Sequence, residues 1–196
     1  MDNNINFKAN YVKPAIIKKL EKGCYKPFQA SIVELELSDV SSIKEVSKSW
    51  GQSVSAVIAT DAHWTLTRYD SHIYALTTQK DKFNNLIPEK VLALADFSEG
   101  SISNHLNYIQ VKPNCISTRY GTFWESMKNR VKNIFSKQKN EYKHIGKEMV
   151  NMLKEKSKGK CLELVSFDEA KSFYKKLGFR SDRSLRAKEN AMIWNA

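Results

Sequence analysis

The sequence has few cysteines, and the three that it has, Cys24, Cys115 and Cys161, lie far apart. An odd number of widely spaced cysteines outside any C-x-x-C pair does not build a disulfide framework, which is typical of a reducing compartment. The four histidines form no H-x-x-x-H pattern, so no metal site is expected.

Long apolar runs are also missing. The longest are as short as Val91–Ala95, whereas a membrane-spanning helix needs about 20 apolar residues. The first 20 residues contain no apolar secretory core. We therefore expect a cytoplasmic protein with no membrane partner.

Negative charge is scarce: 21 acidic residues stand against 32 basic ones, which gives a net charge of +11. Such a field attracts polyanions, including nucleic acid and phosphorylated cofactors, without choosing among them.

With 196 residues, 41% of them hydrophobic, the chain suits one domain. We expect an N-terminal extension over residues 1–28, which holds Pro14 and Pro27 and a short helix around Ala15–Leu20, followed by the domain itself over 29–196.

The first half of this domain reads mainly as strands. Apolar residues at 33, 35 and 37 alternate, and a capping box at Ser42-x-x-Glu45 predicts a helix over about 39–50. Strands are predicted at Ser31–Leu37, His72–Thr78, Lys90–Phe97 and Asn104–Val111, the last two forming an antiparallel hairpin.

Helices and strands alternate in the second half. A helix begins near Ile145 and is closed by Gly159, and a buried strand follows at Cys161–Val165. A second capping box at Ser166-x-x-Glu169 opens a helix that Gly178 ends, and a last strand covers Ala191–Trp194. The order of elements predicts an α/β fold with a mixed, mostly antiparallel central sheet flanked by helices.

A basic segment lies between the two halves. Apolar residues recur at helical spacing over about 119–139, among many lysines, which predicts an inserted basic amphipathic helix. Either it packs as an accessory helix with a solvated outer face, or it docks nucleic acid or an acidic protein face. No nucleic-acid-binding motif supports the second reading further.

Two short motifs could carry chemistry. At Glu141–Lys147 a Gly-containing turn opens a helix. The free N–H groups at the start of a helix bind phosphate, and Lys143 and Lys147 would add positive charge. The alternative is a plain turn with no ligand. Phe173 and Tyr174 lie on a helix whose aromatic side chains could simply pack into the core. Alternatively, the phenol of Tyr174 protonates a leaving group.

Together these motifs resemble the GNAT acetyltransferase superfamily. The run Ala170-x-x-Phe173-Tyr174-x-x-Leu177-Gly178-Phe179 is similar to the superfamily's closing helix motif. Its phosphate signature, Gln/Arg-x-x-Gly-x-Gly/Ala, keeps Gly146 here but has Glu141 and His144 at two other positions. Tyr108–Pro113 is similar to the strand that pairs with the pantetheine arm. The resemblance implies that acetyl-CoA is bound by Ile109, Gln110, Val111, Lys143, His144, Ile145, Gly146, Lys147 and Phe173.

The resemblance also implies a mechanism, in which an amine attacks the thioester of acetyl-CoA directly. A backbone N–H near Gln110–Val111 would hold the thioester oxygen, and Tyr174 would protonate the departing thiolate. A carboxylate or an ordered water would remove the amine proton, and Asp96, Glu99 and Glu163 are the candidate carboxylates.

We expect the acceptor to be an amine on a small molecule, on a protein or on an aminoacyl group of RNA, and the basic surface mildly disfavours polycations. A homodimer is compatible with the resemblance. Two other functions stay open, a GNAT-shaped binding module without catalysis and a nucleic-acid-associated protein.

Overall fold

The computed structural model describes residues 10–79, 86–116, 140–184 and 189–195, and the expected helix over 119–139 lies outside them. Nine strands form one sheet in the order β6-β1-β2-β3-β4-β5-β7-β9-β8. β5 and β7 pair in parallel, and the other neighbours pair antiparallel. The expected fold class, a mixed and mostly antiparallel sheet flanked by helices, is confirmed. The strands are β1 (Asn10–Glu21), β2 (Cys24–Glu34), β3 (Ser71–Thr77), β4 (Val91–Ser98), β5 (Ser103–Val111), β6 (Tyr142–Lys143), β7 (Cys161–Val165), β8 (Arg180–Ser181) and β9 (Ala191–Trp194).

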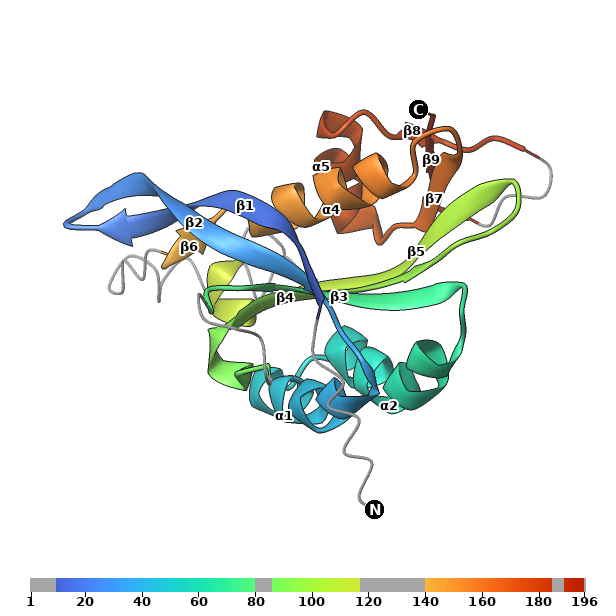
Figure 1. Cartoon of the computed structure of the whole chain (residues 1–196). Coiled ribbons are helices and arrows are strands. Elements are labelled where there is room, and N and C mark those ends of the chain that lie inside the picture. Colours follow the sequence, from blue (N-terminus) through green and yellow to red (C-terminus); the bar gives the residue numbers. More distant parts are fainter. Residues whose placement is uncertain (1–9, 80–85, 117–139, 185–188, 196) are drawn as a thin grey trace, which may run out of the picture.

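Helices cover both faces of the sheet. α1 (Val40–Trp50) and α2 (Ser53–Thr67) lie on one face, and α4 (Ile145–Lys156) and α5 (Lys171–Lys176) lie on the other (Figure 1). Side chains of β4 alternate between these faces: Leu94 belongs to the core under α1 and α2, whereas Ala93 and Ala95 belong to the core under α4. Each face thus has its own hydrophobic core.

The strands and helices expected in the second half agree closely with the structure. β7 and β9 have the expected bounds, α4 begins at the expected residue, and Gly178 follows α5 with a φ of +86°, the left-handed conformation of a residue that ends a helix. The hairpin of β4 and β5 is antiparallel as expected.

The short helix expected around Ala15–Leu20 is wrong. Ala15–Leu20 lies within β1, which pairs with β2 along its whole length and with β6 at the far end. Pro14 follows a register irregularity between Tyr11 and Lys13, where a strand tolerates the missing N–H. Residues 10–28 thus pair with the rest of the sheet, and the assignment of residues 1–28 to an extension stays a prediction.

Both expected capping boxes are also wrong. α1 begins before Ser42, and the reciprocal capping bonds join Glu36 and Asp39, whose carboxylate accepts from the Glu36 N–H at 3.1 Å. The Ser166 hydroxyl donates to the Phe167 carbonyl at 2.6 Å instead of capping a helix. A short 3-10 turn, Asp168–Ala170, precedes α5.

Candidate functional site

The strands β5 and β7 part halfway along β5. Their parallel pairing runs from Ser103 opposite Cys161 to Leu106 opposite Leu164 and goes no further, while β5 continues to Val111. A register irregularity in β5, where Asn107 is the extra residue between Leu106 and Tyr108, marks the point of separation. A bulge of this kind bends a strand and is frequent next to active sites.

Beyond this point β5 presents backbone donors to the open edge. The Lys112 N–H donates to the Leu92 carbonyl at 2.9 Å, and Gln110, two residues earlier, lies opposite Leu94 in the same ladder. Since N–H groups alternate in direction along an antiparallel strand, those of Ile109 and Val111 point away from β4. The Gln110 side chain is buried and donates to the Val111 carbonyl at 2.8 Å, which satisfies that acceptor.

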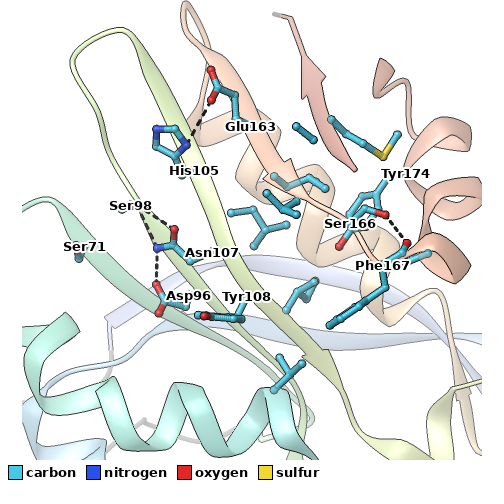
Figure 2. Close-up of a pocket in the computed structure, with 18 of the residues that line it drawn as sticks. Ser71, Asp96, Ser98, His105, Asn107, Tyr108, Glu163, Ser166, Phe167 and Tyr174 are labelled. Carbon is cyan, nitrogen blue, oxygen red and sulfur yellow. Dashed lines mark hydrogen bonds and ion pairs between the residues drawn. The ribbon is translucent and has the colours of Figure 1, made fainter. Parts of the chain in front are cut away.

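A cavity of about 1080 Å³ opens at the separation of β5 and β7. Its walls come from α2 on one face of the sheet, from β4, β5 and β7, and from α5 on the other face (Figure 2). Its size suits a small ligand, since ligand pockets commonly measure about 300–1,000 Å³. Of the residues expected to act on acetyl-CoA, Ile109 and Tyr174 line this cavity.

Tyr174 is nearly enclosed in the α4-side core. The residue is 7% exposed, and its ring meets those of Phe173 and Phe179 edge-on, at 5.1 and 5.6 Å between centroids. Burial raises the pKa of its phenol to about 12, so the group is protonated at neutral pH. Burial is the one cause of this shift, and no hydrogen bond joins the hydroxyl to another described residue. The hydroxyl is not among the fully buried unpartnered atoms of the described residues, so it can bond water or a ligand in the cavity that it lines.

Gly146 packs against Phe173 and Val111, two apolar residues of the expected acetyl-CoA site. A Cβ at this position would meet Phe173 Cζ at 3.3 Å and Val111 Cγ2 at 3.5 Å. The first helical turn of α4 therefore packs directly on β5 and on α5. This packing gives a reason for glycine here that sequence reasoning, which assigned Gly146 to close phosphate approach, did not find.

His144 is the residue with the special backbone conformation in the expected phosphate turn. It precedes α4 with φ +69° and ψ +8°, in the left-handed region that glycine adopts most easily and that histidine enters more often than most residues. The position is the one where the GNAT signature has its first glycine. The backbone there keeps a glycine-like shape although the side chain differs.

Positive charge gathers at this turn. Partial burial and the nearby ammonium groups of Lys18, Lys147 and Lys143 lower the pKa of His144. Lys18 comes from β1, where it lies opposite Lys143 of β6. The Lys143 ammonium lies 3.9 Å from the Tyr25 ring centroid, a cation–π contact. Ile145 is buried in the core, so it anchors the turn rather than facing solvent.

Asp96 is the one of the three expected base candidates that is buried at the cavity wall. It is 5% exposed, and its Oδ1 accepts from Asn107 Nδ2 at 3.0 Å. Burial, together with the negative charge of Asp61 on α2, raises its pKa, against the lowering effect of the Asn107 hydrogen bond. A carboxyl with a raised pKa in a cleft is a common mark of a general base.

The other two carboxylates have histidine neighbours. Glu163 also lines the cavity, and its Oε2 lies 3.6 Å from His105 Nδ1. Glu99 does not line the cavity, and its Oε1 lies 3.7 Å from His72 Nε2.

The α2 wall of the cavity was missed by sequence reasoning. α2 contributes Asp61, Trp64 and Thr65, and Arg68 follows directly after its end. Its buried positions include Ser55, Ala59 and Ala62, small residues that give little apolar contrast along the helix. The signal that could have found it is the helical spacing of these small residues.

No protein-family model matches this sequence, and no curated protein matches it either. Among solved structures, PaiA N-acetyltransferase from Thermoplasma acidophilum in complex with coenzyme A is similar, with a TM-score of 0.50 and 15% identity over 85% of this chain and 97% of that one. NAA60 from Arabidopsis thaliana in complex with acetyl-CoA matches with a TM-score of 0.45 and 11% identity, over 84% and 97% of the two chains. The fold is that of the GNAT N-acetyltransferases.

Within the described residues no helix is long and apolar enough to span a membrane.

Proposed function

We propose that this protein transfers an acetyl group from acetyl-CoA to a primary amine. The observation that carries the proposal is Tyr174, a buried residue at the wall of a cavity between β5 and β7, whose hydroxyl is protonated and has no hydrogen bond to the described residues. The fold supports the choice of acetyl-CoA, because PaiA, a structure of the same fold, holds coenzyme A.

The residues expected to bind acetyl-CoA fit its parts. The diphosphate would meet the first N–H groups of α4, with the ammonium groups of Lys18, Lys143 and Lys147 nearby. The pantetheine amides would pair with the outward N–H groups of Ile109 and Val111, and Phe173 and Gly146 would form the apolar floor between the two. Gln110 contributes through its backbone position only, because its side chain already bonds Val111.

The chemical step is a direct displacement. The amine nitrogen attacks the thioester carbon, a C–N bond forms, and the C–S bond breaks. The thiolate takes the proton of the Tyr174 hydroxyl, while Asp96 takes the proton that the amine loses. An outward N–H of β5 stabilises the negative charge on the carbonyl oxygen in the transition state. Asn107 holds the Asp96 carboxylate in place through its amide.

Release of free thiol from acetyl-CoA tests the proposal. The purified chain is mixed with acetyl-CoA and a panel of amines, and thiol is measured continuously, with native mass spectrometry reporting coenzyme binding separately. We expect amine-dependent thiol release, and Tyr174→Phe is expected to lower kcat by about 10²-fold, within the range for general acid catalysis. The coenzyme affinity of this variant should stay the same, since it lacks only the hydroxyl.

Two results would count against the proposal. Coenzyme binding without thiol release with any amine would favour a GNAT-shaped binding module. Thiol release that is unchanged in Tyr174→Phe at every pH would remove Tyr174 as the acid while leaving the reaction.

A further inference from the structure

The hairpin of β1 and β2 extends as a two-stranded ribbon beyond the helices that cover the sheet (Figure 1). Its tip is tight: Lys22 and Gly23 have φ values of +47° and +84°, as in a type I′ turn, and Glu21 still pairs with Cys24. We call residues 18–26, together with the short strand β6 beside them, the β1–β2 arm. The arm is thus a narrow projection built from paired strands.

Lysines gather on this arm without acidic partners. They are Lys18, Lys19, Lys22, Lys26 and Lys143. None of them forms an ion pair with another described residue. Glu21 and Glu141 are also exposed there, and they neutralise only part of the charge. By contrast Lys13, nearer the other end of β1, has a partner in Glu155 at 2.5 Å. The arm therefore carries an excess of positive charge.

The lysines also stand opposite one another in the sheet. Lys18 lies directly opposite Lys143 of β6, and Lys19 lies directly opposite Lys26 of β2. Like charges at directly opposed positions destabilise a pair of strands. An anion bound between or beside these ammonium groups would remove the repulsion. This arrangement points to an anionic partner independently of the total charge.

The two opposed pairs lie on different faces of the ribbon. The Lys19 ammonium lies 5.4 Å from the ring centroid of Phe28, which packs against the core under α4, so Lys19 and its neighbour Lys26 share the α4 side. Because side chains alternate along a strand, Lys18 and its neighbour Lys143 lie on the other side. A flat anionic surface contacts one face of a ribbon at a time, whereas a groove with phosphates along both walls contacts both.

The dimensions of the arm fit a groove of duplex DNA. Two paired strands lie about 4.8 Å apart, and the major groove of B-DNA, about 12 Å wide, admits a two-stranded ribbon. The major groove of A-form RNA is too deep and narrow for side chains to read. None of the exposed large hydrophobic side chains lies between Lys18 and Lys26, so this part of the arm has no apolar anchor for a lipid surface.

We propose that the β1–β2 arm binds duplex DNA through its phosphates, with the ribbon in the major groove and ammonium groups directed at both walls. Binding is independent of base sequence, because contacts to phosphate carry no sequence information. Lys18 and Lys143 are shared with the proposed diphosphate site, whereas Lys19, Lys22 and Lys26 are not. The inference does not depend on the proposed acetyl transfer.

Fluorescence anisotropy of a labelled DNA duplex of about 20 bp, titrated with the full chain at several salt concentrations, tests the proposal. We expect a Kd of about 1–100 μM at physiological salt. The logarithm of the association constant should fall against the logarithm of the salt concentration with a slope of about −3 to −4.5, since each phosphate contact contributes about −0.9. Absence of binding, or binding that does not change with salt, would overturn the inference.

The double variant Lys22→Gln/Lys26→Gln locates the contact. Both side chains are exposed, so the fold should be kept, and we expect the Kd to rise about tenfold or more while the salt slope loses about two units. Lys44→Gln/Lys48→Gln is the matched control, because both lysines are exposed on α1 and the same charge is lost. An equal loss of affinity in the two double variants would show that net charge, and not the arm, binds the DNA.

Other polyanions test the choice of partner. Duplex RNA of the same length and vesicles of phosphatidylserine and phosphatidylcholine should bind more weakly than the DNA, and the arm variant should affect them less. Either one binding as tightly as DNA through Lys22 and Lys26 would overturn the assignment to duplex DNA.

Thiol release from acetyl-CoA keeps the two proposals apart. The variant Lys22→Gln/Lys26→Gln should release thiol at the parent rate, because neither residue belongs to the proposed acetyl-CoA site. If no amine supports thiol release but DNA binding depends on the arm, the acetyl transfer is wrong and the arm inference stands. If thiol is released and DNA does not bind, the arm inference is wrong and the acetyl transfer stands.

Discussion

At the start of α4, Lys18, Lys143 and Lys147 surround a helix N-terminus, whereas on the α2 side of the sheet the cavity is lined by carboxylates. The first region suits an anionic diphosphate and the second suits a cationic amine. β5 connects the two, since Val111 contacts the α4 turn and Asn107 bonds Asp96. The net charge of +11 has the same sign as the first region and the opposite sign to the second.

The largest effect is expected at the acidic end. Asp96→Asn keeps the hydrogen bond from Asn107 but removes the proposed base, and we expect kcat to fall by about 10²- to 10⁴-fold. In the parent protein kcat/KM should fall as the pH drops through the raised pKa of Asp96. A stopped assay over the pH range measures both, and an unchanged rate would show that another group or water takes the proton.

Asp96→Asn should also stabilise the folded protein, although it lowers the rate. The pKa of Asp96 is raised by burial, so its charged form is destabilised in the folded state at neutral pH. Asp96→Asn should therefore unfold at a higher temperature than the parent at pH 7. The difference should shrink as the pH falls and vanish below about 3.9, the unfolded-state pKa, where both forms are neutral. Calorimetry at several pH values checks this.

The sequence was informative where local patterns decide the structure. β7 is a compact apolar run and α5 has aromatic residues at helical spacing, so both elements could be predicted, and α5 carries the candidate site residues Phe173 and Tyr174. β1 could not, because Pro14 and the nearby Pro27 suggested irregular structure and only pairing with β2, a long-range contact, makes it a strand. The acidic wall could not either, since Asp61 and Glu163 come to line the same cavity only when α2 and β7 fold onto β5.

An intermediate effect is expected at the basic end, and it separates the two regions. Lys147→Gln removes a charge beside the α4 N-terminus, and we expect the Kd for coenzyme A to rise about three- to tenfold. The effect should diminish as salt is added. The KM for the amine should not change. Glu163→Gln should do the reverse, changing the amine KM and not the coenzyme Kd. If either variant moved both constants, the two regions would not bind separate substrates.

The smallest effect concerns the backbone that holds the basic end in place. His144 has a left-handed conformation that disfavours a non-glycine residue by about 1 kcal/mol, so His144→Gly should relieve this strain. The greater freedom of glycine in the unfolded chain offsets part of the gain, and we expect a net change of about 0 to 0.5 kcal/mol in unfolding free energy. His144→Ala keeps a Cβ but loses histidine's tolerance of this region, and we expect a loss of about 1 kcal/mol. Urea unfolding of the pair measures the difference. Because both variants remove the same imidazole, an equal loss in the two would assign the stability to the side chain rather than to the left-handed turn that presents the α4 N–H groups.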